Sequence, residues 1–200
     1  MITGQSLQRL TQISSPLLSS ITSYVDKVLN SQIDGLLSSI KDELEDACEI
    51  YLTTINGWIP VLTDKDLQYH LSQLETQLPI GSLKPEVGVL FLIVYLVTLV
   101  PAEFDESIIQ LYSVVKSCHT IFQSSAPSLD VIRAGILLSI YEHGQSLDQA
   151  CYLTIGACAR MGYAMGLHQT LSEKPPSNPV DLVSFATKRH IWWTIIITER

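Results

Sequence analysis

The stretch SLDQACYLTIGACARMGYAMGLH, residues 146–168, decides the fold class because its apolar residues recur at helical spacing. Apolar side chains three or four residues apart share one face of an α-helix, whereas a half-buried strand would alternate polar and apolar residues. Ser146 and Gln149 fit a capping box with Ser146 at the N-cap. The spacing predicts an amphipathic helix over 147–168, with one apolar face of Leu147, Cys151, Thr154 or Ile155, Cys158, Met161 and Met165.

Small residues lie beside this face and predict a close contact with another helix. Ala150, Ala157 and Ala164 recur at heptad spacing, with glycines between them. Glycine costs a helix about 1 kcal/mol relative to alanine, so a compensating contact is needed. We interpret Gly162 and Gly166 as a notch for a neighbouring helix. A phosphate-binding loop is the disfavoured alternative, because it places its glycines before a helix.

His168 closes the predicted helix. A histidine at this end can bond the last carbonyl groups, and its charged form complements the helix dipole. A metal-binding or catalytic role would need partners, and no spacing in the sequence brings His143, Cys151 or the Cys118-His119 pair to it. We therefore expect His168 to be structural.

The rest of the chain shows the same helical pattern between turn signals. Helices are expected over 46–55, 64–78, 85–100, 107–123 and 128–142, and from 179 onward, with short ones within 1–40. Ser128 and Asn178 are predicted N-caps, and Pro85 and Pro179 suit first turns. Since the sequence contains no alternating strand runs, it predicts an all-α fold, an irregular multi-helix bundle of about seven to nine helices.

The most apolar run, VGVLFLIVYLVTLV at 87–100, predicts a buried core helix. A membrane-spanning helix needs about 20 apolar residues, and this run is shorter. The N-terminus lacks the charged and apolar regions of a signal peptide. Residues 1–44, rich in Ser and Leu, are expected to be a partly flexible segment before a folded domain over 45–200. We expect no membrane association.

Composition excludes several function classes. The formal net charge is −8, and Lys188-Arg189 is the longest basic run, whereas phosphate binding needs clustered bases. We therefore expect no direct nucleic-acid binding. The four cysteines are scattered without a C-x2-C pair, which argues against a zinc ribbon and a disulfide framework. Reduced, buried thiols in an intracellular protein are the expected state.

Several motifs together resemble the middle homology region of fungal zinc-cluster transcription factors. In that family an early helix exits through Trp-x-Pro, a later helix ends in Gly-Leu-His, and the next carries basic residues, an aromatic pair and a terminal acidic-Arg pair. The resemblance covers about residues 45–200 and rests on the order and spacing of its parts. The matching residues are Trp58, Pro60, Gly156, Arg160, Gly166, Leu167, His168, Lys188, Arg189, Trp192, Trp193, Glu199 and Arg200.

The sequence departs from the family pattern in three respects. Ala186 occupies the position at which the family has a Glu before the basic run, and His190 occupies the family's third basic position. The six-cysteine cluster that binds zinc and DNA in intact members is absent, so no zinc or other cofactor is expected in this chain. The sequence also stops at Arg200, inside a predicted helix. We expect the domain to be incomplete there, as a truncated product or as one exon-limited piece.

The last predicted helix is apolar nearly all round in its WWTIII segment, 192–197. Such a helix requires burial on two sides. We therefore expect an exposed apolar patch on this helix and a tendency to associate.

Enzyme chemistry is the least favoured class. The acidic run 42–46 could be imagined as a magnesium-diphosphate motif, but no second acidic motif follows, so a solvated helix face is expected. Cys118 and His119 are sequence neighbours and point about 100° apart on a helix, which disfavours a nucleophile–base pair. Nucleophile-elbow, zincin and Walker motifs are absent from the sequence. We predict that the chain is not an enzyme.

The resemblance implies a nuclear regulatory domain that controls transcription by RNA polymerase II through ligand or protein interaction. A small-molecule inducer and protein partners, including a second copy or full-length relatives, are the expected partners. The alternative is a helical interaction module that pairs with full-length relatives and blocks them.

Overall fold

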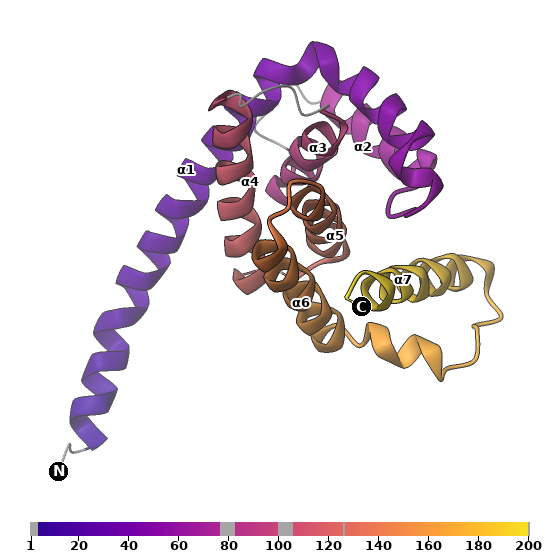
Figure 1. The fold of residues 1–200 in the computed structure, drawn as a ribbon. Coiled ribbons are helices and arrows are strands. Elements are labelled where there is room, and N and C mark those ends of the chain that lie inside the picture. The colour runs from indigo at the N-terminus through magenta and orange to yellow at the C-terminus, as the bar shows by residue number, and fades with distance from the viewer. Residues whose placement is uncertain (1–3, 77–82, 100–105, 126, 200) are drawn as a thin grey trace.

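The computed structural model describes residues 4–76, 83–99, 106–125 and 127–199, and it describes side chains for 27–74, 83–99, 106–124 and 127–199. Every regular element within these residues is helical, which confirms the all-α prediction. In chain order, with η denoting a 3-10 helix, the elements are α1 (Gly4–Thr53), η1 (Ile55–Gly57), α2 (Asp64–Thr76), α3 (Pro85–Thr98), α4 (Glu106–Ser125), α5 (Leu129–Gly144), α6 (Asp148–Ala164), η2 (Leu167–Leu171) and α7 (Pro179–Thr198) (Figure 1).

The centre of the bundle is formed by α3 and α5 (Figure 1). Helix α3 contacts α1, α4 and α5, and α5 contacts α3, α4, α6 and α7. Residues 87–94 of α3 are all buried, which confirms the predicted core helix. A helix that is apolar all round can be stable only when neighbours cover every face. Among the described residues, no helix is long and apolar enough to span a membrane.

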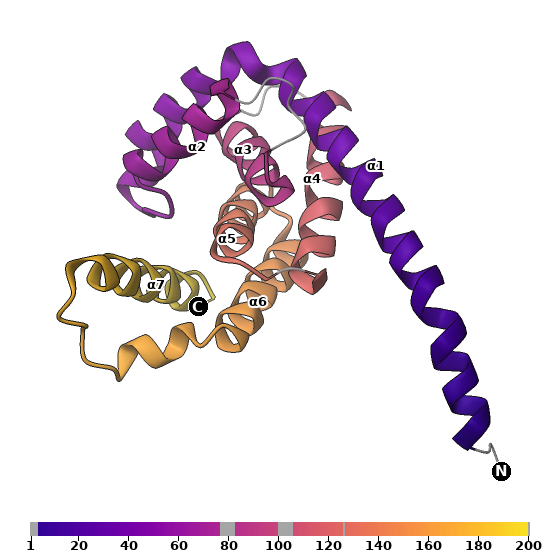
Figure 2. The same cartoon turned by 180° about the vertical axis from the view of Figure 1, so that it is seen from behind.

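The largest departure from the predicted elements is α1, a single helix of 50 residues. We expected short separate helices in this region. Its C-terminal half buries Leu29, Ile33, Leu37, Ile40 and Leu44, whose spacing of three and four places them on one face toward α3. The N-terminal part extends away from the other helices in both views (Figures 1 and 2). The division at residue 44 falls inside α1, and the proposed flexibility of 1–44 stays a prediction.

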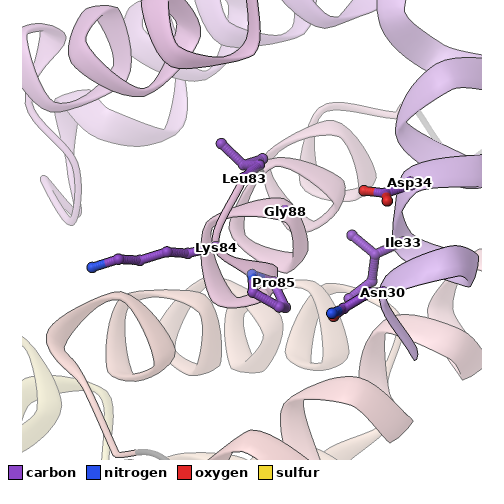
Figure 3. A pocket seen from close by; sticks show the side chains of 7 residues that line it. All are labelled: Asn30, Ile33, Asp34, Leu83, Lys84, Pro85 and Gly88. Atoms are coloured by element: carbon purple, nitrogen blue, oxygen red, sulfur yellow. The ribbon is translucent and has the colours of Figure 1, made fainter. Parts of the chain in front are cut away.

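Helix α3 approaches α1 most closely at Gly88. A Cβ atom at this position would lie 2.5 Å from Cγ2 of Ile33, so only glycine fits here. The small cavity beside this contact measures about 50 Å³ and is lined by Asn30, Ile33, Asp34, Leu83, Lys84, Pro85 and Gly88 (Figure 3). Ligand pockets usually measure about 300–1,000 Å³, so this cavity is a packing feature.

Three predicted helix starts are confirmed. The Ser128 side chain accepts a hydrogen bond from the Val131 N–H, the Asn178 side chain accepts one from the Val180 N–H, and Pro85 occupies the first turn of α3. These contacts satisfy backbone donors that the first turn leaves free.

The predicted capping box at Ser146 is wrong. Ser146 has a φ of 59° and lies in the tight turn between α5 and α6, so its side chain does not cap α6. Leu147 takes the N-cap position without a side-chain hydrogen bond, and its N–H donates to the Glu142 carbonyl at 2.8 Å. This backbone hydrogen bond closes the turn, and Ser146 adopts the left-handed conformation within it.

All four cysteines are free thiols in the described chain, as expected. Cys48, Cys118 and Cys158 are buried, and Cys151 is half-buried. Burial raises the pKa of Cys118 to about 11, so this thiol stays protonated at neutral pH. Burial also lowers the pKa of His119 to about 4, and the ring's Nε2 lies 3.1 Å from the Val131 carbonyl. This geometry leaves the Cys118-His119 pair without the thiolate that nucleophilic catalysis needs.

Candidate functional site

The joint between α6 and α7 is built around Trp192. The Trp192 side chain is buried, and its ring centroid lies 4.8 Å from that of Tyr163 in an edge-on arrangement. His168 packs beside both rings, with centroids 4.9 Å from Tyr163 and 6.1 Å from Trp192. Tyr163 and His168, both from the stretch 146–168, therefore pack with Trp192 of α7 in one aromatic cluster.

The two glycines of this stretch have different roles. A Cβ atom on Gly162 would lie 2.9 Å from Cζ3 of Trp192, so Gly162 is the predicted packing notch. Gly166 has a φ of 71°, follows the end of α6 and begins η2. The prediction of a notch is wrong for Gly166, because this residue supplies the left-handed turn that non-glycine residues adopt only with strain.

His168 packs on aromatic rings in place of the predicted hydrogen bond to helix carbonyls. Its Nδ1 atom is buried and has no hydrogen-bond partner among the described residues, and the same holds for Nε1 of Trp192. Leu167 beside it is fully buried. The described residues contain no group of three or more His, Cys, Asp or Glu side chains arranged to hold a metal ion.

The structure brings the Trp-x-Pro exit of α1 beside α7. His190 Nε2 lies 2.6 Å from the Pro60 carbonyl, a contact between residues far apart in sequence. Trp58, two residues earlier, is 64% exposed despite its size. The other motif residues within the described chain are exposed or half-buried: Gly156, Arg160, Lys188, Arg189, Trp193 and Glu199. Arg200 lies outside the described residues.

An apolar groove of about 600 Å³ opens beside Trp58. Its walls come from the α1–α2 connection, the C-terminal ends of α3, α5 and α7, and the start of α6. The groove is lined by Ile55, Trp58, Ile59, Val97, Leu99, Ser139, Ile140, Tyr141, His143, Gly144, Gln145, Cys151, Ile197 and Thr198. Its volume falls within the range of small-molecule pockets, and its mainly apolar lining is typical of them.

Two hydroxyl groups in the groove wall, those of Ser139 and Thr198, are already hydrogen-bonded. Ser139 donates to the Ile136 carbonyl at 2.7 Å, and Thr198 donates to the Thr194 carbonyl at 2.8 Å. Burial raises the pKa of the Cys151 thiol, which keeps it protonated and poorly nucleophilic. The wall can therefore bind apolar groups, and it carries no activated nucleophile.

A buried polar cluster behind the groove fixes α4, α5 and α6 to one another. Glu142, which is fully buried, accepts from Lys116 Nζ at 2.5 Å, from the Thr154 hydroxyl at 2.6 Å and from the Tyr112 hydroxyl at 2.9 Å. Lys116 also donates to Thr154. Burial, followed by the Glu142 carboxylate, raises the pKa of Tyr112. Each polar group of the cluster compensates another, as buried polar groups must.

A second polar contact fixes the connection that carries Trp58. Buried Tyr51 accepts from the Leu62 N–H at 3.2 Å and donates to the Asn56 side chain at 3.2 Å. Burial raises the pKa of the Tyr51 phenol to about 12, so it stays a donor at neutral pH. Nearby, Arg133 bonds both Asp66 and Asp130, at 3.3 Å and 3.1 Å. These bonds hold the groove wall at both ends of the connection.

Comparisons with known proteins identify the family of the chain. The family described as "Fungal specific transcription factor domain" matches residues 50–200. The chain belongs to this family. A curated relative, "Transcription factor BOA15" of Botryotinia fuckeliana (strain B05.10), is 29% identical over 128 residues, which cover 64% of this chain and 69% of the relative. No solved structure matches the chain.

Membership in the fungal-specific transcription factor domain family confirms the resemblance read from the motifs and gives the chain a transcription-regulatory role. The family is one of transcription factor domains and not a family of enzymes. The matched residues include the aromatic cluster, the Trp58 groove and all of α7 within the described chain. The regulatory contributions of the individual motif residues stay predictions.

Sequence reasoning did not find the groove or the polar cluster behind it. The groove is assembled from five separate segments, so no local spacing indicates it. Glu142 left a weaker signal, because a carboxylate that directly follows the mainly apolar run 134–141 needs a partner if it is buried. Lys116 on the preceding amphipathic helix is that partner.

Proposed function

We propose that this domain controls RNA polymerase II transcription through a ligand or protein segment that binds the groove beside Trp58. The observation that carries the proposal is the groove itself, about 600 Å³ in volume and lined mainly by apolar side chains. Burying apolar surface contributes roughly 25 cal/mol per Å², so the groove favours apolar occupants. A small apolar inducer or the apolar side chains of a coactivator fit this chemistry.

The position of the groove supports a regulatory role. Its wall includes the C-terminal end of α7 and the connection that follows α1, and His190 and Pro60 hold these two segments together. An occupant of the groove would contact both segments at once. It would thereby change the stability of the contact between them. A ligand shifts a conformational equilibrium by its difference in affinity for the two states.

The proposed setting is the nucleus, and the chain is proposed to act without a cofactor and without contacting DNA itself. Other subunits or full-length relatives would supply the DNA contact. In intact relatives the resemblance implies that a zinc cluster serves this purpose.

A tethered reporter assay tests the proposal. The full chain is fused to an unrelated DNA-binding domain, and the variants Trp58→Ala and Ile197→Ala are compared with Tyr152→Ala and Leu153→Ala. The two pairs have closely similar exposure, 64% and 67% against 71% and 64%, but only the first pair lines the groove. We expect reporter output to change at least severalfold with the first pair alone. Equal output from all four variants would contradict the proposal.

The exposed apolar residues of α7 favour a second candidate, an interaction module that blocks full-length relatives. Val180, Leu182, Val183, Trp193 and Ile197 are each 43% or more exposed. Of these, only Trp193 and Ile197 lie in the segment 192–197, where an exposed apolar patch was predicted. Large exposed apolar patches mark interaction sites. Co-expression of the chain with a full-length relative would reduce the relative's reporter output if this candidate is correct, and unchanged output would contradict it.

A further inference from the structure

The groove beside Trp58 carries no basic charge of its own. Among the described residues that line it, none is Asp, Glu, Lys or Arg. The stretches of sequence that supply the lining are 55–59, 97–99, 139–151 and 197–198, and their charged residues are the two acids Glu142 and Asp148. A charged ligand group that leaves water needs compensating charge. The sign of the surrounding charge therefore decides which ligand groups the groove favours.

The side chains next to the lining add negative charge. Glu142 behind the wall is paired with Lys116, so these two charges offset each other. Asp148 at the start of α6 and Glu199, the C-cap of α7, are both exposed. His143 is the one described lining residue that can become positively charged. Its Nδ1 lies 3.8 Å from an Asp148 carboxylate oxygen, which compensates that charge.

The backbone contributes in the same direction. Three helices have their C-terminal ends in the groove wall, at Leu99 after α3, at Gly144 of α5 and at Thr198 of α7. A helix C-terminus carries the equivalent of about half a negative charge. The positive end of α6 lies in the same wall and offsets the end of α5. The ends of α3 and α7 are not offset in this way, so the groove has a negative potential.

Aromatic side chains supply a further attraction for a cation. Trp58 lines the groove with a ring that is 64% exposed, and the half-buried ring of Tyr141 lines it from α5. The face of an aromatic ring attracts a nearby ammonium group, and the effect is largest for tryptophan. The groove thus combines apolar walls with two features that favour positive charge.

We propose that the ligand of the Trp58 groove is a small molecule with an apolar body and one protonated amine. The inference rests on the proposed function, because it takes this groove as the ligand site. The apolar body covers the walls, and the ammonium group lies between the aromatic rings and the helix ends. An anion with a large apolar body still binds through that body, but more weakly than its cationic counterpart.

An extended protein segment is a poorer occupant of the groove. Its main-chain N–H and C=O groups would need hydrogen-bond partners once they leave water. The wall hydroxyls of Ser139 and Thr198 already donate to carbonyl groups of their own helices. A compact amine brings few polar groups besides the ammonium itself, and the groove volume of about 600 Å³ is in the range for small-molecule sites.

Three probes that share a naphthalene body test the charge preference. Protonated 1-naphthylmethylamine, neutral 1-naphthalenemethanol and the anion 1-naphthoate are each titrated into the full chain. The methyl NMR shifts of Ile55, Ile59, Ile140 and Ile197, which line the groove, give a dissociation constant for each probe. We expect the amine to bind at least about threefold more tightly than the carboxylate, with the alcohol between them.

A lysine in the groove lining should reverse this order. Gln145→Lys places a positive charge in the lining, and Gln110→Lys adds the same charge at an exposed position of α4 that does not line the groove. We expect 1-naphthoate to become the tightest probe with Gln145→Lys alone.

The outcomes separate this inference from the proposed function. Carboxylate binding as tight as amine binding, tightest binding of the alcohol, or an order that Gln145→Lys leaves unchanged would each overturn the amine proposal, although the groove would remain a ligand site. The absence of groove shifts with all three probes would instead contradict the proposed function, and the amine proposal with it.

Discussion

Gly162 of α6 and Trp192 of α7 are in direct contact, and the Cβ position of the glycine lies 2.9 Å from Cζ3 of the indole. The contact explains why a glycine stands in the middle of a helix, where it lowers helix stability. It also fixes the position of α7, whose C-terminal end forms part of the Trp58 groove. The motif residue Trp192 is thus packed against the rest of the fold at a position where α6 carries only a glycine, Gly162.

Gly162→Ala should destabilise the fold by about 1–3 kcal/mol, because the added methyl group overlaps the buried Trp192 ring. Gly156→Ala is the matched control on the same helix. A Cβ there meets only Nη1 of Arg160, at 3.5 Å, so the gain in helix propensity of up to about 1 kcal/mol remains. Urea denaturation measures both free energies of unfolding. Equal effects of the two substitutions would contradict the packing role of Gly162.

Gly166→Ala should destabilise by about 1–2 kcal/mol for a different reason, since a φ of 71° strains any residue with a Cβ atom. Gly166→Asn should lose less, because asparagine tolerates the left-handed region better than alanine. Thermal and urea denaturation of both variants check this order. If alanine proved as stable as glycine, Gly166 would not be the turn residue described above.

Lys116→Met should cost about 2–3 kcal/mol, because it leaves the Glu142 carboxylate buried without its cation. The lysine side chain is 29% exposed, which places the expected loss at the lower end of values for buried pairs. Lys174→Met, at an exposed position, should change the free energy of unfolding by no more than about 0.5 kcal/mol. Matching losses in the two variants would show that the pair does not stabilise the fold.

Acid should destabilise the protein through His119. Histidine in the unfolded chain has a pKa of about 6.5, and burial lowers the folded value to about 4. As pH falls from 6.5 to 4, the unfolded chain binds a proton that the folded chain does not, so the free energy of unfolding decreases by about 3 kcal/mol in total. Burial lowers the pKa of His70 too, which acts in the same direction.

Unfolding measured between pH 7 and pH 4.5 tests the role of His119. The variant His119→Gln should show a shallower decline with falling pH than the unmodified protein, whatever its stability at neutral pH. His143→Gln, which replaces an exposed imidazole, is the matched substitution control. A slope unchanged by His119→Gln would mean that this histidine does not carry the acid sensitivity.

The sequence predicted those features that depend on local spacing. The core helix over 85–98 and the caps at Ser128 and Asn178 follow from apolar content and from side chains that satisfy first-turn donors. The notch at Gly162 followed from its small neighbours. These features depend on residues within a few positions of one another, and spacing reports such relationships directly.

Features set by the tertiary arrangement were not predictable in this way. Gly166 fits the helical spacing as well as Gly162, and only the direction of the chain into η2 distinguishes them. Ser146 carries the right residue for a cap, but the short turn between α5 and α6 requires a different backbone conformation. The C-terminal half of α1 packs against α3, which is distant in sequence. The groove beside Trp58 is formed by residues from five separate segments, so it can be recognised only once the tertiary structure is known.

The central claim is that the groove beside Trp58 binds apolar groups, and methyl NMR of the full chain tests it most directly. The fluorescent probe 1-anilinonaphthalene-8-sulfonate is titrated into protein labelled at isoleucine methyl groups. The account predicts saturable shifts confined to Ile55, Ile59, Ile140 and Ile197, which line the groove, and weaker binding to Trp58→Ala. Ile50 and Ile109, 45% and 46% exposed elsewhere, serve as internal controls. Shifts spread equally over the controls, or none at the groove, would contradict the claim.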